Sequence, residues 1–334
     1  MYYIQNSWLY IGILIFIISL LKNNAYSRIL SNILFLIFVA IASTRGVEFN
    51  PDTKNYVMHF SSFIGTEFSY SQLFSWGWGI GYNSVAILLT KVFSDKNYIL
   101  FFLSFIPGII FSITFYKYKY HSSIILFIYS TILLVTTTAT IRHSWALSIS
   151  FLVLNSIILL NRNNIKTLFY PMLFHYSTIS LTTILIFNKY KDKLNHKFIL
   201  IFMFLSTILV ILGKDFIEIL YVHFIDRATS GGVRLFGFRN ILNLVLIILI
   251  LFSFSRLSLI KKRLDFLLIA SMILSIALMP FYGINRIVSF FTLIILIYFQ
   301  KYQGSYINNL NNMILSIVSF ISLIYFYLTV RIAI

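Results

Sequence analysis

The chain has 334 residues, of which 59% are hydrophobic and only 10% are charged, and its mean hydropathy is +0.90. Soluble domains carry about 25% charged residues, so this composition excludes a soluble protein and indicates an integral membrane protein made of helices. The net charge is +17, yet most basic residues lie in short loops between apolar runs. That is the positive-inside bias of membrane proteins, so we expect no binding to nucleic acid. Cysteine is absent, which excludes disulfides and thiolate chemistry.

The first half of the chain is predicted to cross the membrane several times around one polar segment. Basic residues after the first apolar run place that loop inside and the N-terminus outside. Residues 45–80 are too polar to span and form an outer loop. The next apolar run, Tyr82–Phe93, is short, so we expect it to be re-entrant or surface-lying. The spans expected here are Tyr2–Leu21, Ile29–Thr44, Tyr98–Tyr116, Ser122–Thr138 and Ser144–Leu160, with a tight outer turn at Thr140–His143.

The second half contains one segment whose charges do not fit a simple crossing. Thr167–Phe187 has basic residues on both sides, so a single span would leave one cluster outside. We therefore predict a hairpin of two half-helices, broken between Pro171 and His175, with both ends inside and His175 at its tip. A second outer loop is expected at 214–240. The remaining spans are Phe198–Gly213, Ile241–Leu259, Phe266–Met279, Ile287–Phe299 and Met313–Val330.

These segments together predict an all-α polytopic membrane protein with about ten full transmembrane helices plus re-entrant or half helices. We see no internal repeat and no linker. Residues 1–334 are therefore expected to form a single transmembrane domain, with two larger outer-face loops at 45–80 and 214–240.

Several arginines fall on the outer side, against the positive-inside rule. Arginine binds phosphate through two parallel hydrogen bonds and cannot lose its charge, so such a group at helix ends predicts a site for a lipid-linked diphosphate. The alternative for each is an anchor at the membrane surface or a solvated loop residue. No spacing of metal ligands is present, so we expect no metal and no cofactor. The arginines are Arg45, Arg142, Arg234, Arg239 and Arg286.

Two further residues suggest acid–base chemistry. His175 titrates near neutrality and is the candidate general base, although a hydrogen-bonded core histidine is the alternative. Asp52 follows Arg45 closely, which favours its ionised form and a positioning role, although it also fits a plain turn residue after Pro51.

Four short motifs, in this order, resemble a known family. They are Thr44-Arg45-Gly46-Val47 followed by Asp52 and Tyr56, Ile141-Arg142 with Ala146, Phe174-His175-Tyr176-Ser177, and Asn285-Arg286-Ile287 with Phe290-Phe291. They are similar to the motifs of the EpsG/Wzy-type bacterial polysaccharide polymerases. The family often has Arg-Gln where this chain has Arg142-His143.

The resemblance implies an O-antigen or other surface-polysaccharide polymerase with a GT-C-like fold in the bacterial inner membrane. It would transfer the growing glycan from undecaprenyl diphosphate to a sugar hydroxyl of an undecaprenyl-diphosphate-linked repeat, at a site facing the periplasm. Besides these donor and acceptor molecules, its partners would be membrane lipid and a chain-length regulator protein. Tyr56, His143 and Ser177 would contact substrate.

Two other function classes remain open from the residues alone. A lipid-linked oligosaccharide flippase would show charge along a mid-membrane path and repeat symmetry. A membrane acyltransferase modifying a surface glycan would place its histidine and arginine toward a cytoplasmic acyl donor. The outer positions predicted for Arg45, Arg142 and Arg286 favour the polymerase.

Overall fold

The computed structural model describes residues 2–21, 24–44, 51–74, 78–133, 140–160, 165–175, 178, 181–182, 185, 244–249, 266–278, 285–301 and 308–332. Within these ranges the chain is helical and contains no strand. The longer helices are α1 (Tyr2–Leu20), α2 (Ala25–Ser43), α6 (Lys96–Lys117), α9 (Ile141–Leu160), α15 (Phe266–Leu278), α16 (Asn285–Lys301) and α17 (Asn308–Ile332).

The fold is that of a membrane protein. By length and composition, three of the described helices can cross a bilayer, namely α2, α6 and α9. The other apolar helices of the described ranges are shorter by the same criterion, and they include parts of α1, α16 and α17. Ten crossings and a GT-C-like architecture stay predictions, because several of the expected spans lie outside the described residues.

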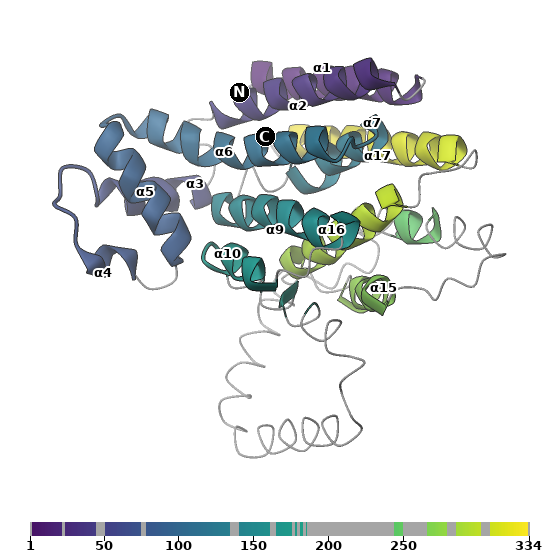
Figure 1. Cartoon of the computed structure of the whole chain (residues 1–334). Helices are drawn as coiled ribbons and strands as arrows, with labels where there is room; N and C mark the ends of the chain where they lie inside the picture. The colour runs from purple at the N-terminus through teal and green to yellow at the C-terminus, as the bar shows by residue number, and fades with distance from the viewer. Residues whose placement is uncertain are drawn as a thin grey trace, which may run out of the picture.

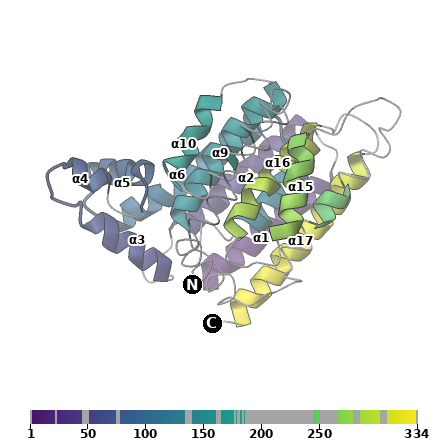
Figure 2. The same ribbon diagram turned by 90° about the horizontal axis from the view of Figure 1, so that it is seen from below.

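The helices pack in layers, as Figure 1 shows. α1 lies on α2, α2 packs on α6, α6 packs on α9, and α9 packs on α16, while α17 contacts α1. Three short helices gather beside one end of these layers, and Figure 2 shows them projecting to one side. They are α3 (Pro51–Ser61), α4 (Tyr70–Leu73) and α5 (Ile80–Val92).

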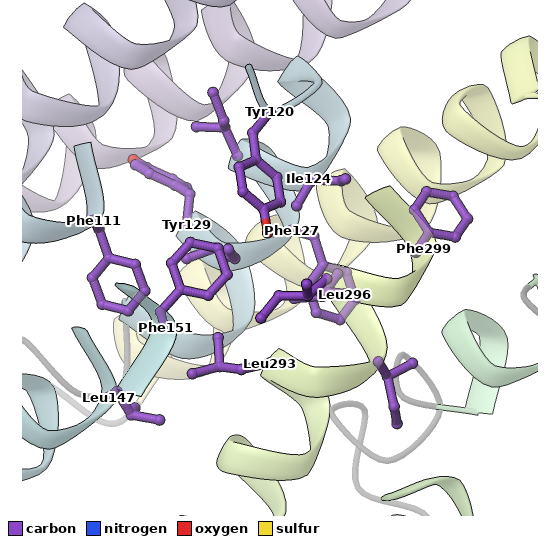
Figure 3. Close-up of a cluster of buried hydrophobic side chains, with 14 of the residues drawn as sticks. Phe111, Tyr120, Ile124, Phe127, Tyr129, Leu147, Phe151, Leu293, Leu296 and Phe299 are labelled. Atoms are coloured by element: carbon purple, nitrogen blue, oxygen red, sulfur yellow. The ribbon is translucent and has the colours of Figure 1, made fainter. Parts of the chain in front are cut away.

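The core is a belt of aromatic and aliphatic side chains between the layers (Figure 3). Its centre joins Phe111 of α6, Phe127 of α7 (Ser122–Phe127) and Phe151 of α9. One buried polar pair lies inside this belt: the Tyr120 hydroxyl donates to Asn155 Oδ1 at 2.7 Å. This pairing avoids the cost of leaving a polar atom unsatisfied in an apolar interior.

Helix boundaries differ from the sequence-based prediction at three places that matter for the site. Residues 51–74 of the expected outer loop contain α3 and α4, because Pro51 suits the first turn of α3 and a capping box between Ser69 and Gln72 begins α4. The tight turn predicted at Thr140–His143 is instead the beginning of α9, so that Arg142 and His143 lie in its first turn. The expected span Ser122–Thr138 begins as α7 and continues as a π-helical stretch, Ile128–Leu133.

The helix break predicted between Pro171 and His175 is present. A 3₁₀ turn, Ile165–Leu168, leads into α10 (Phe169–Met172), and a turn at Leu173 and Phe174 precedes His175. The sidedness of the proposed hairpin stays a prediction, since most of its second half lies outside the described residues.

Candidate functional site

A pocket of about 490 Å³ lies where α3, the start of α5 and the start of α9 meet. Three elements supply its walls, and Arg142 is the one fully charged side chain in the lining that the described residues provide. The lining residues are Asn55, Tyr56, Met58, His59, Trp78, Thr140 and Arg142. A single fixed positive charge among aromatic and amide groups suits an anionic ligand with a polar organic body.

The helical spacing of α3 brings its pocket-lining residues onto one side of the helix. Asn55, Tyr56 and His59 are neighbours on a helix surface because residues three and four apart share a face. Tyr56 is buried at 6% exposure; its ring packs edge-on against Trp78 at 5.3 Å and, in a tilted arrangement, against Tyr82 at 5.6 Å. These ring contacts fix α3 against the beginning of α5.

Trp78 lies between two polar side chains of the pocket. The His59 ring is stacked on it with centroids 3.9 Å apart and planes 5° apart. The guanidinium carbon of Arg142 lies 4.9 Å from the Trp78 ring centroid, within the range of a cation–π contact. The backbone N–H of Arg142 also reaches the Tyr56 hydroxyl at 3.5 Å. Trp78 therefore sets the positions of both groups.

A short hydrogen-bond chain orients His59. Its Nε2 lies 2.9 Å from Oδ1 of Asn83, and the Asn83 amide Nδ2 donates to the Leu73 carbonyl at 3.0 Å. Burial lowers the pKa of His59 below its usual value. The hydrogen bond to Asn83 raises it in part, and the positive charge of Arg142 lowers it further. His59 is therefore neutral at physiological pH.

The broken helix closes the back of this region. The N–H of Gly81 donates to the Leu173 carbonyl at 2.8 Å. A Cβ on Gly79, whose φ is +84°, would lie 2.8 Å from that same carbonyl oxygen, so only glycine fits there. Phe174 stacks flat on Trp145 of α9 at 5.1 Å. The turn before His175 is thus wedged between α5 and α9.

Two predicted site residues, His143 and His175, meet behind the pocket. Both are buried, at 2% and 4% exposure, and their rings are 5.4 Å apart. The His143 ring also packs edge-on against Phe290 of α16 at 5.2 Å. Phe290 lies one helical turn after Arg286, so the beginnings of α9 and α16 lie side by side.

The structure thus brings together part of the set predicted from the sequence. Arg142 and Tyr56 line the pocket. His143 and His175, which follow Arg142 and Phe174 in the chain, contact each other and are not in the lining. Asp52 and Arg286 lie in the first turns of α3 and α16. The other predicted residues, Arg45, Ser177, Arg234 and Arg239, lie outside the described residues. Among the residues that are described, no three metal-ligating side chains form a cluster.

Sequence reasoning missed His59, Trp78 and Asn83 as site residues. The signal for His59 was available, because Asp52, Asn55, Tyr56 and His59 follow the spacing of one helix face. Recognising it required assigning a helix to the segment after Pro51. No local signal joins Trp78 and Asn83 to this face, since their contacts with His59 are tertiary.

Comparison with known proteins gives one family. The model of the EpsG family matches residues 28–333 of the chain. No curated protein and no solved structure matches. The match begins within α2 and runs to the end of α17, so it includes the whole pocket.

Proposed function

Because this chain belongs to the EpsG family, we propose that it is a polysaccharide polymerase that joins lipid-linked oligosaccharide repeats. The donor is the growing glycan on undecaprenyl diphosphate, and the acceptor is a sugar hydroxyl of an undecaprenyl-diphosphate-linked repeat. The acceptor oxygen attacks the donor's anomeric carbon, and the lipid diphosphate leaves. The product can be O-antigen or another surface polysaccharide, and a chain-length regulator protein is the expected partner.

The observation that carries this proposal is the placement of Arg142. Its guanidinium is held over Trp78 at the pocket, where it offers a planar fork to a diphosphate. Charge develops on the leaving diphosphate, and a preorganised arginine stabilises it without a metal or cofactor. In this proposal Arg45, Arg286 and either Arg234 or Arg239 supply further contacts, and Ser177 and His143 belong to the same substrate region.

Two further residues have roles in this scheme. Asp52, at the start of α3, orients an arginine or the acceptor. The sequence predicts His175 as the base, but this histidine lies against His143 and not in the pocket lining. Tyr56 contributes an aromatic wall to the pocket, on which a sugar ring can rest. These assignments are proposals for mutagenesis.

In this proposal the pocket faces the periplasm of the inner membrane in a multi-span, GT-C-like protein, as the loop charges of the whole sequence predict. Arg28 in the first turn of α2, Lys117 at the end of α6 and Lys301 at the end of α16 then lie on the cytoplasmic side. The pocket end, with α3 to α5, carries Asp52, Glu67 and Asp95 together with Lys54, Lys91 and Lys96.

The test is reconstitution of the purified protein in vesicles with a chemically defined undecaprenyl-diphosphate-linked repeat. We expect a ladder of oligomers and release of undecaprenyl diphosphate. A vesicle that moves the lipid-linked repeat between leaflets without lengthening it would identify a transporter. Transfer of an acyl group to the repeat would identify an acyltransferase. Either result overturns the proposal.

A further inference from the structure

His59 is the histidine that lines the pocket beside Arg142. Its ring stacks face-on against Trp78, so the plane of the imidazole is fixed and only its edge remains available for hydrogen bonding. The His59 ring is half-buried and lines the pocket, so an acceptor hydroxyl bound in the pocket can reach its edge.

The Asn83 contact determines which nitrogen of His59 carries the proton. Asn83 uses its amide N–H to donate to the Leu73 carbonyl, so the carbonyl oxygen Oδ1 is the atom that faces His59. An oxygen can only accept, so Nε2 of the imidazole must donate to it. In the neutral ring the proton is then on Nε2, and Nδ1 carries the lone pair. Asn83 is fully buried, and its two hydrogen bonds hold the amide in this orientation.

We propose that Nδ1 of His59 is the general base that deprotonates the acceptor sugar hydroxyl, with Asn83 as the residue that positions it. This inference rests on the proposed polymerase function. The acceptor oxygen forms a bond to the anomeric carbon while the bond from that carbon to the diphosphate oxygen breaks. The bonding electrons leave with the diphosphate, and the hydroxyl proton passes to Nδ1. The imidazolium returns the proton to water through the pocket.

Arg142 couples the base to the donor. In the empty pocket its positive charge helps to keep His59 unprotonated, which is the form a base needs. A diphosphate bound to Arg142 brings negative charge next to the same imidazole and makes Nδ1 more basic. The base therefore gains proton affinity when the donor is in place. His59 therefore takes a proton from the acceptor hydroxyl more readily when the donor is bound than when the pocket is empty.

The geometry favours His59 over His175 for this step. His175 is 4% exposed, packs against His143 and is absent from the pocket lining. His59 is partly exposed and is held within the lining by two contacts, one with Trp78 just before α5 and one with Asn83 in α5. In this arrangement His175 supports the beginning of α9 through His143, and the proton transfer belongs to His59.

The test compares His59→Gln, Asn83→Ala and His175→Gln in the vesicle assay. Gln at 59 keeps an N–H for Asn83 but removes the base, so turnover should fall by about 10²–10⁴-fold. Binding of undecaprenyl diphosphate, measured by calorimetry, should remain within about twofold of wild type. Lys54→Gln, on an exposed position of the same helix, is the matched control and should keep full turnover. Thermal unfolding in detergent checks that each variant is folded.

Asn83→Ala gives a readout that a merely structural role would not produce. Because the Asn83 hydrogen bond raises the pKa of His59, its loss should move the acid limb of the turnover–pH profile to lower pH. The other titratable groups around the imidazole are Arg142, Tyr56 and Tyr82. Ser84→Ala, on the exposed side of α5, should leave the limb unchanged.

The outcomes separate the base assignment from the polymerase function. If wild type forms a ladder and His59→Gln turns over normally while His175→Gln is inactive, His175 is the base and this inference fails alone. A loss in His59→Gln that is matched by an equal loss of diphosphate affinity also overturns it. If wild type itself forms no ladder, the polymerase function fails first.

Discussion

At the scale of single residues, Trp78 links the cation of the pocket to its histidine. Arg142 lies over the indole at 4.9 Å and His59 stacks on it at 3.9 Å. Lysine keeps the charge of arginine but loses its planar fork and its stacking. Arg142→Lys should therefore collapse the product ladder to single-repeat products, with donor affinity about 10- to 100-fold weaker, the value of a lost charge-assisted hydrogen bond.

The control for this substitution is Arg28→Lys. Arg28 lies in the first turn of α2, at the end of the helix layers away from the pocket. It removes a guanidinium from the same protein without touching the pocket, so its ladder should match that of wild type on a gel. A normal ladder from Arg142→Lys would show that this arginine only anchors the helix.

His121, at the other end of the helix layers, governs a different property. It caps α7 by accepting the Ser123 N–H at Nδ1, and burial together with the nearby Arg28 lowers its pKa to about 4. The folded protein therefore favours the neutral ring, whereas the unfolded chain takes up a proton near its ordinary pKa of about 6.5. Stability from this group is complete above about pH 6.5 and is lost as the pH falls from there toward 4.

His121→Asn tests this pH dependence. Asparagine is a good N-cap whose oxygen can accept the same N–H, and it does not titrate. We expect the Tm of wild type in detergent to fall more steeply between pH 7 and pH 5 than that of the variant. Equal slopes would mean that His121 is not responsible for the acid sensitivity.

At the scale of elements, the contact between the broken helix and α5 positions the pocket. Gly79 and Gly65 both have positive φ, at +84° and +73°, so alanine strains the backbone at either by about 1–3 kcal/mol. Only at Gly79 would the new Cβ also meet a backbone oxygen, that of Leu173 at 2.8 Å, whereas nothing lies within 4 Å at Gly65. Overpacking costs about 1–3 kcal/mol more.

We therefore expect Gly79→Ala to lower the Tm further than Gly65→Ala and to reduce polymerisation, because it displaces Trp78 and Asn83 from their partners. Gly65→Ala should keep its activity. Similar Tm values and similar ladders for the two variants would show that the close approach of Leu173 is dispensable.

At the scale of the whole molecule, the loop charges of the sequence predict its orientation in the membrane. The chain contains no cysteine, so a cysteine introduced at one position is the only thiol that can react with a label. Glu67→Cys should react with a membrane-impermeant maleimide added from outside, and Lys117→Cys should react only after permeabilisation. Asp192→Cys, outside the described residues, should also be protected if the predicted hairpin returns inside. Reaction at position 192 from outside would contradict the hairpin.

The sequence alone determined the class, because hydrophobic content and loop charge act through the bilayer and need no tertiary contact. It also predicted Arg142 and, through the family resemblance, Tyr56 as site residues, and both line the pocket, while their roles stay predictions. The sequence also predicted the break before His175, because a proline and flanking charges are local signals. It did not show that Arg142 begins a helix or that residues 51–61 form one, because boundaries depend on neighbours that stabilise helix ends.

Only the tertiary structure brought the pocket together. His59, Trp78 and Asn83 come from different elements and meet through a stacking contact and a hydrogen bond that no local pattern encodes. It also separated the two histidines, placing His59 in the lining and His175 behind it against His143. The physical reason is that composition and periodicity decide which surfaces are buried, whereas the choice of partner across helices depends on how those surfaces fit together.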